Sequence, residues 1–269
     1  MKIVLVFDAD DTLWRTEWQY SKALADFFAY LYSEFRDITP NLNSLKQRFD
    51  EIDKKLFPEW GISRGRWYMA MREVYHEILS HIERKFGKEY LPTENARIRQ
   101  EKQIFDIGDQ PFNFRGQKWK EHAADLLEEL RGREGYSLCL LTCCDEIVWI
   151  EKSAFLGVDK YFSNILVIPN RKTSADFVNV SGYGEGKNEN ILFYSIGNGA
   201  NDILPALEIS ERWFGIHIPD RSTSPVFEKE LGQDIYSSPR IEHPRVATLL
   251  SIAELKNFDF ENFNSGSES

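Results

Sequence analysis

Cysteine is scarce in this sequence, and so are long apolar runs and positive net charge. Its 269 residues include three cysteines, Cys139, Cys143 and Cys144, which lie close together. An odd, clustered set argues against a disulfide framework and fits a reducing compartment, and the spacing matches no common zinc site. We therefore expect a cytoplasmic protein.

The apolar runs are short. The longest ones, such as residues 3–7 and 137–142, are far too short to cross a bilayer, and Asp8 interrupts the first before the apolar region of a signal peptide could form. The formal net charge of -10 argues against a general binder of phosphate backbones. We expect no membrane and no nucleic acid as a partner, and the sequence leaves a homodimer open.

Hydrophobic periodicity divides the chain into a helical insertion and a region of alternating elements. Helical spacing without a convincing strand covers residues 17–37, 42–56, 64–86 and 93–107. After residue 116 the expected helices are 116–133, 146–155, 174–180, 201–209 and 243–252. The expected strands are 3–7, 136–142, 165–168, 191–196, 212–218 and 234–236. Strands that alternate with helices predict a parallel sheet.

The fold class follows from this division. We expect an α/β protein with a Rossmann-like parallel sheet core and an all-α cap domain. The core would comprise residues 1–15 and 111–257, the cap residues 16–110, and a polar tail residues 258–269.

Several of the predicted strands end in polar residues. The first runs into residues 8–12 (DADDT), the second ends on Thr142, and the strand at 191–196 runs into residues 197–202 (GNGAND). A cationic turn, residues 170–173 (NRKT), lies between the last two. Open α/β sheets bind ligands at the carboxyl ends of their strands, so these groups are expected at one site.

Their chemistry suits a phosphoryl group and a divalent ion. Asp8 and Asp10 would repel each other unless a cation or a proton lay between them, and a metal-assisted reaction would use one as nucleophile and the other as proton carrier. The Thr142 hydroxyl and the Lys172 ammonium group could hold phosphate oxygens. Each residue alone also has an ordinary interpretation as a helix cap, a solvated charge or a turn residue.

The order of these motifs is Asp-x-Asp-x-Thr, then Thr, then Lys, then Gly-Asn-Gly-x-Asn-Asp, with the helical insertion after the first. This order resembles the haloacid dehalogenase superfamily, and more narrowly its phosphatases with a helical cap. The resemblance covers residues 2–218. It implies a Mg²⁺-dependent phosphatase that hydrolyses a small phosphorylated metabolite through an aspartyl phosphate.

The resemblance implies a role for each motif residue. Asp8 would be the nucleophile, and Asp10, its pKa raised by acidic neighbours, would be the general acid and base. Thr142 and Lys172 would hold the transferred phosphoryl group. The expected Mg²⁺ ligands are Asp8, Asp10 through its backbone carbonyl, Asn198 and Asp202. The expected substrate contacts are Thr12, Trp14, Arg15 and Cys143, with Arg64, Arg66 and Trp67 of the cap as further candidates.

Three positions qualify the resemblance. Asp11 stands where many relatives have Gly, a variation also met in capped members. Asn198 stands where related phosphatases usually have Asp, and because one negative charge is lost there, we expect a weaker metal site. Lys187, in a glycine-rich segment, competes with Lys172 for the lysine role.

Other functions remain open. Family dehalogenases lack the second Asp, so Asp10 favours phosphoryl transfer over a dehalogenase. No cap lysine clearly supports an imine-forming phosphonate hydrolase. A catalytically weakened binding or regulatory protein is the third alternative.

Overall fold

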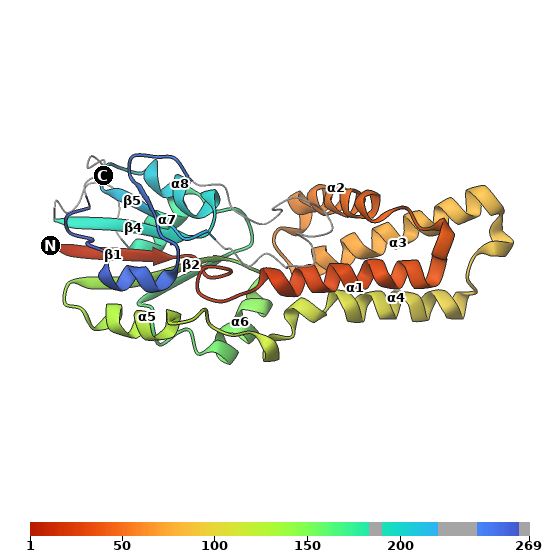
Figure 1. The fold of residues 1–269 in the computed structure, drawn as a ribbon, viewed down its shortest axis with the longest axis horizontal. Helices are drawn as coiled ribbons and strands as arrows, with labels where there is room; N and C mark the ends of the chain where they lie inside the picture. Colours follow the sequence, from red (N-terminus) through yellow and green to blue (C-terminus); the bar gives the residue numbers. More distant parts are fainter. Residues whose placement is uncertain (183–189, 220–240, 264–269) are drawn as a thin grey trace. The chain divides into compact units, whose positions relative to one another are not determined.

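The computed structural model describes residues 1–182, 190–219 and 241–263. The chain forms two compact units (Figure 1). The sheet unit comprises residues 1–18 and 115–269, and the helical unit comprises residues 19–114. The helical insertion expected after the first strand is confirmed. No helix in the described ranges combines the length and apolar character needed to cross a bilayer.

The sheet unit is built on a six-stranded parallel sheet with the order β3-β2-β1-β4-β5-β6. Its strands are β1 (Lys2–Phe7), β2 (Tyr136–Cys143), β3 (Asn164–Ile168), β4 (Ile191–Gly197), β5 (Trp213–His217) and β6 (Val246–Thr248). The predicted Rossmann-like α/β fold is confirmed. Strand β1 lies in the middle, paired with β2 and β4, which explains why it is apolar on both faces.

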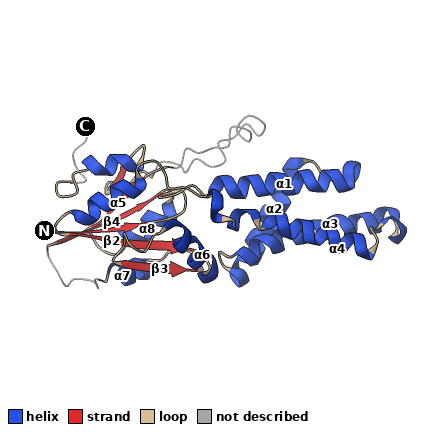
Figure 2. Ribbon diagram, turned by 90° about the horizontal axis from the view of Figure 1, so that it is seen from below, coloured by secondary structure: helices blue, strands red, loops and turns tan. Residues whose placement is uncertain are grey.

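Helices cover both faces of this sheet (Figures 1 and 2). They are α5 (Ala123–Gly132), α6 (Glu146–Leu156), α7 (Ser174–Ser181), α8 (Ala200–Leu207) and the 3₁₀ helix η5 (Ile252–Asn257). Helices α7 and α8 pack on one face, where Val4 and Val6 of β1 share a core with Phe177 of α7. Helix α5 and η5 pack together on the other face.

The helical unit holds four long helices. Four short 3₁₀ turns border these helices or join them. The long ones are α1 (Glu17–Phe35), α2 (Leu42–Trp60), α3 (Arg64–Phe86) and α4 (Glu94–Gly108). The turns are η1 (Arg36–Ile38), η2 (Lys88–Tyr90), η3 (Gln110–Phe112) and η4 (Phe114–Gly116). Asn41, Ser63 and Thr93 cap α2, α3 and α4 by accepting a backbone N–H bond. A core of aromatic and aliphatic side chains, among them Phe27 and Tyr75, holds the helices together.

Two helix boundaries differ from the sequence prediction by more than two residues. Helix α2 continues through Pro58 to Trp60, although we expected it to end near the proline. Helix α5 begins at Ala123 rather than near residue 116, because His122 has a φ of 65° and this left-handed conformation cannot continue a helix.

The C-terminal region departs most from the prediction. The helix expected at 243–252 is wrong: the chain forms β6 there, which pairs with β5, and then η5. Pairing with the open edge of the sheet overrides the local helical pattern. Residues 258–263, which the sequence placed in a polar tail, lie on the sheet unit, where the Tyr194 hydroxyl donates to the Phe260 carbonyl at 2.6 Å. The strand expected at 234–236 and Lys187 lie outside the described residues.

Candidate active site

The chain turns sharply after β1, and Asp11 holds this turn. Its φ of 57° is a left-handed conformation that is uncommon outside glycine. The Asp11 carboxylate accepts hydrogen bonds from the backbone N–H groups of Thr16 at 2.8 Å and Glu17 at 3.0 Å, and so caps the start of α1. Burial raises the pKa of Asp11 to about 7 despite these two bonds. Asp11 therefore serves the backbone, not the site.

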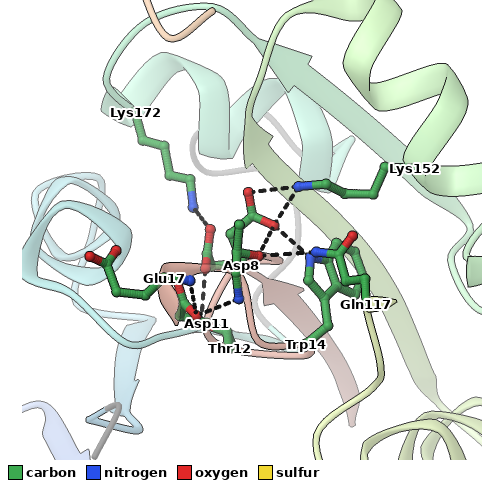
Figure 3. A network of polar contacts seen from close by, with 10 residues as sticks. Asp8, Asp11, Thr12, Trp14, Glu17, Gln117, Lys152 and Lys172 are labelled. Atoms are coloured by element: carbon green, nitrogen blue, oxygen red, sulfur yellow. Dashed lines mark hydrogen bonds and ion pairs between the residues drawn. The ribbon is translucent and has the colours of Figure 1, made fainter. Parts of the chain in front are cut away.

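Asp8 lies beside Lys172 (Figure 3), and this lysine also contacts a second carboxylate, that of Asp202. The Nζ atom of Lys172 lies 2.5 Å from Asp8 Oδ1 and 2.8 Å from Asp202 Oδ1. The Thr12 hydroxyl donates to Asp8 Oδ2 at 2.8 Å. Three segments thus meet around the buried Lys172 ammonium group. They are the C-terminal end of β1, the turn after β3 and the first turn of α8.

The charges on this side of the site do not balance. Burial and, next, the charge of Asp202 raise the pKa of Asp8, Lys172 offsets only part of this, and the resulting pKa is about 7. Burial alone would lower the pKa of Lys172, but the two carboxylates outweigh burial and raise it. Lys172 is therefore a permanent cation between two acids, and Asp8 carries excess negative charge when ionised.

Asp10 has a lysine of its own. Lys152 Nζ, from α6, lies 2.8 Å from Asp10 Oδ1 and 3.0 Å from Oδ2. The Trp14 indole donates to Oδ1 at 2.5 Å and the Thr16 hydroxyl donates to Oδ1 at 2.9 Å. The Thr16 hydroxyl in turn accepts from Gln117 Nε2 at 3.2 Å.

This environment corrects the expectation for Asp10. Burial by itself would raise the pKa of Asp10, as acidic neighbours were expected to do. The charge of Lys152 and the hydrogen bonds from Lys152, Trp14 and Thr16 outweigh burial, and the pKa of Asp10 is lowered. Asp10 is therefore held as a carboxylate.

The loop after β4 is shaped by close backbone packing. A Cβ at Gly197 would lie 2.3 Å from the Asp202 Cβ, so only glycine fits. Asp202 Oδ2 accepts from the Gly199 N–H at 2.9 Å. His217 Nε2, at the end of β5, lies 3.0 Å from the Asn198 carbonyl, and because a carbonyl only accepts, this nitrogen carries the proton. Burial lowers the pKa of His217, so it stays neutral.

Comparison with solved structures identifies the fold formed by these strands and the helical insertion. A haloacid dehalogenase-like family hydrolase from Xanthomonas campestris matches with a TM-score of 0.66 at 19% identity over 94% of this chain and 88% of that chain. A 2-haloacid dehalogenase from Pseudomonas syringae pv. tomato DC3000 matches with a TM-score of 0.51 at 15% identity, over 96% of this chain and 97% of that chain. The chain has the haloacid dehalogenase-like hydrolase fold. No family model matches the sequence, and no curated protein matches it.

Within the haloacid dehalogenase-like fold, the oxygens at the strand ends have the chemistry that Mg²⁺ prefers. Asp8 and Asp202 both contact Lys172. Thr12 Oγ1 lies 2.8 Å from Asp8 Oδ2 and 3.3 Å from Asn198 Oδ1, so Asn198 is close to Asp8. The excess negative charge at Asp8 also suits a cation. No described cluster of three or more His, Cys, Asp or Glu side chains could hold a metal ion, so the set needs the Asn198 amide and a backbone carbonyl.

The other expected site residues are placed as follows. Thr142 is buried at the end of β2, on the strand next to β1. Trp14 is fully buried with its N–H on Asp10, so it orients the carboxylate and offers no open ring to a substrate. Arg15 is exposed. Burial raises the pKa of the Cys143 thiol to about 12, which leaves it uncharged.

The cap candidates are engaged with their own unit. Arg66 Nε donates to Asp53 at 2.8 Å, and Arg64 forms an ion pair with Asp109. Trp67 packs edge-on against Tyr20 and Phe49. These contacts favour helix packing, the alternative interpretation of this set.

Four residues of the site escaped the sequence analysis, namely Thr16, Gln117, Lys152 and His217. A usable signal existed for Lys152, because it lies three and four residues after Trp149 and Val148, on the buried face of α6. The exposed face of the same helix carries Ile147 and Ile150, so hydrophobic periodicity did not show which face is inside.

Proposed function

We propose that the protein is a Mg²⁺-dependent phosphatase that hydrolyses a small phosphorylated metabolite through a phosphoryl group on Asp8. One observation carries the proposal. Two carboxylates two residues apart have separate lysines, Asp8 with Lys172 and Asp10 with Lys152. Lys172 beside Asp8 can offset negative charge on a transferred phosphoryl group, and Asp10, held as a carboxylate, can accept a proton.

The first step would break the bond between phosphorus and the leaving oxygen. A carboxylate oxygen of Asp8 attacks phosphorus, and the leaving oxygen departs with the bonding electrons and takes up a proton from solvent or from Asp10, where the preceding hydrolysis has left one. Lys172 lies 2.5 Å from the attacking carboxylate, close enough to offset negative charge on the transferred group. In the second step water attacks the same phosphorus, Asp8 leaves as a carboxylate, and inorganic phosphate is released.

The residues that would hold Mg²⁺ are Asp8, the Asp10 carbonyl, Asn198 and Asp202. When bound, the ion supplies Lewis-acid stabilisation of the phosphoryl oxygens and offsets the negative charge at Asp8. Asn198 contributes an amide oxygen in place of a carboxylate, so we infer a weaker site than one with three acids.

Asp10 supports a phosphatase over a dehalogenase, because an alcohol leaving group takes up a proton, whereas a halide needs none. Lys152 gives no support to an imine-forming phosphonate hydrolase. Its two carboxylate contacts raise its pKa against the effect of burial, so it is a poor nucleophile.

The amide at Asn198 favours a second candidate, a binding or regulatory protein that keeps the fold but has little turnover. A panel of phosphorylated metabolites assayed with Mg²⁺, alongside the Asp8→Asn variant, tests the main proposal. Phosphate release that requires both Mg²⁺ and Asp8 supports it. Binding of beryllium fluoride at Asp8 without turnover of any ester would support the second candidate instead.

A further inference from the structure

The Asp10 carboxylate has two unlike oxygens. Oδ1 accepts from three donors, namely Lys152 Nζ, Trp14 Nε1 and Thr16 Oγ1. Oδ2 accepts from Lys152 alone among the described residues, at 3.0 Å. A carboxylate oxygen has about two lone-pair sites, so Oδ1 is saturated and Oδ2 has one site left.

The donors to Oδ1 are fixed by packing. Trp14 is fully buried and packs edge-on against Trp119 at 5.3 Å between ring centres. Thr16 Oγ1 accepts from Gln117 Nε2, so its single hydroxyl proton points to Asp10 Oδ1. These neighbours prevent the carboxylate from exchanging its two oxygens.

Lys152 completes this arrangement from a separate element. Its side chain is 4% exposed, whereas that of Asp10 is 30% exposed, so the ammonium lies inside and the carboxylate has an open side. Its Nζ is 5.9 Å from the centre of the Trp14 ring, close enough for a favourable cation–π contact. Lys152 thus approaches Asp10 from the protein side and leaves the remaining lone pair of Oδ2 open.

We propose that Lys152 is a positioning residue that presents Asp10 Oδ2 as the base for hydrolysis of the phosphorylated Asp8. This inference rests on the proposed phosphatase function and deepens it. As the water oxygen bonds to phosphorus, one water proton moves to Oδ2 and the bond from phosphorus to Asp8 breaks. Oδ2 then gives that proton to the leaving oxygen of the next substrate or to solvent.

The experiment uses p-nitrophenyl phosphate, whose leaving group departs without a proton, so that loss of the base slows only the second step. Lys152→Met keeps the length of the apolar chain and removes the ammonium group. Lys160→Met is the matched control, because Lys160 is exposed and also lies over an aromatic ring, that of Tyr161. Rapid-mixing kinetics measure the burst of p-nitrophenolate, and mass spectrometry of quenched protein detects a phosphoryl group on Asp8.

We expect Lys152→Met to lower kcat by roughly 10²-fold, the lower end of general-base effects. It should also show a burst approaching one p-nitrophenolate per site and accumulate phosphorylated Asp8. Equal kcat in Lys152→Met and Lys160→Met overturns the inference. A slower variant without a burst also overturns it, because a structural defect slows both steps. Wild-type protein without turnover refutes the proposed function itself, which separates the two failures.

A second measurement needs no turnover. The indole N–H resonance of Trp14, assigned by its loss in Trp14→Phe, reports on Asp10 Oδ1, and it should shift in Lys152→Met but not in Lys160→Met. An unshifted resonance contradicts the inference. Should Lys152→Met fail to fold, Lys152→Gln keeps an N–H donor without the charge, and the same burst is expected from it.

Discussion

Asp8 and Asp10 are two residues apart, yet they lie in opposite electrostatic environments. On the Asp8 side one ammonium group, Lys172, serves two carboxylates. On the Asp10 side one ammonium group, Lys152, serves one carboxylate that also accepts from Trp14 and Thr16. Burial raises the pKa of both acids. It prevails at Asp8, whose pKa is raised, whereas Lys152 and the hydrogen bonds outweigh it at Asp10, whose pKa is lowered.

This difference shows that one short turn can place two aspartates in environments of different charge and hydrogen bonding. The Asp8 side has an excess of negative charge and thus favours a cation or a phosphoryl group that brings one. The Asp10 side is neutralised and fixed, which suits a group that must receive a proton on one defined oxygen. Charge count and hydrogen-bond count, more than distance along the chain, separate the two acids.

The largest expected effect concerns turnover. Asp8→Asn removes the proposed nucleophile and should lower phosphate release by roughly 10⁴-fold or more. Asp10→Asn should cost about 10²–10⁴-fold, because it removes one proton carrier. Malachite-green phosphate assays with Mg²⁺ compare the two variants. Equal turnover in Asp8→Asn and wild type would contradict the assignment of the nucleophile.

The second effect concerns folding stability. Lys172→Met leaves Asp8 and Asp202 facing each other without their cation, and breaking a buried pair in this way costs about 3–5 kcal/mol. Lys152→Met should cost less, because Asp10 keeps two donors and is partly exposed. The free energy of unfolding in urea measures both, with the exposed Lys22→Met as control. A greater loss of unfolding free energy in Lys152→Met than in Lys172→Met would contradict this prediction.

The third effect is the pH dependence of stability without metal. Between the ordinary pKa of 3.8 and about 7, folded Asp8 keeps a proton that the unfolded chain releases, so stability falls as pH rises through this window. Asp8→Asn should remove a decrease on the order of 4 kcal/mol over this whole window, of which about 2–3 kcal/mol falls above pH 5. Asp11, whose pKa is also raised to about 7, retains its own share of the slope.

Urea unfolding at about pH 5 and about pH 8, with a chelator present, checks this slope. Asp10 contributes with the opposite sign, because its lowered pKa gives stability that is lost as pH falls through the folded value. Asp10→Asn should therefore leave the slope between these two pH values in place. An identical slope in wild type and Asp8→Asn would show that the pKa of Asp8 is not raised in the folded protein.

The smallest effect concerns the metal ligands. Asn198→Asp adds a third carboxylate and should tighten Mg²⁺ binding by about tenfold, because ligand charge tunes the affinity of such sites. Isothermal titration calorimetry measures the affinity. The variant should be less stable than wild type in a chelator, since it adds negative charge beside Asp8 and Asp202. Unchanged affinity would mean that Asn198 is not a ligand.

Much of the fold follows from local patterns. The continuous apolar run in β1 predicts a central strand, and helix α3 spans Arg64–Phe86 as its periodicity predicts. The pattern at 243–252 fails because β6 exists only through its pairing with β5. A three-residue strand carries too few residues for periodicity to detect.

The sequence by itself determined which acids, hydroxyls and lysine stand at the strand ends, because short motifs and buried strands are local features of the chain. Only the tertiary structure decided which partner each acid has. Lys152 is 142 residues from Asp10, and the pairing depends on the crossover between β2 and β3. A pKa depends on burial and on charges close in space, so no spacing in the sequence could show that Asp8 and Asp10 are shifted in opposite directions.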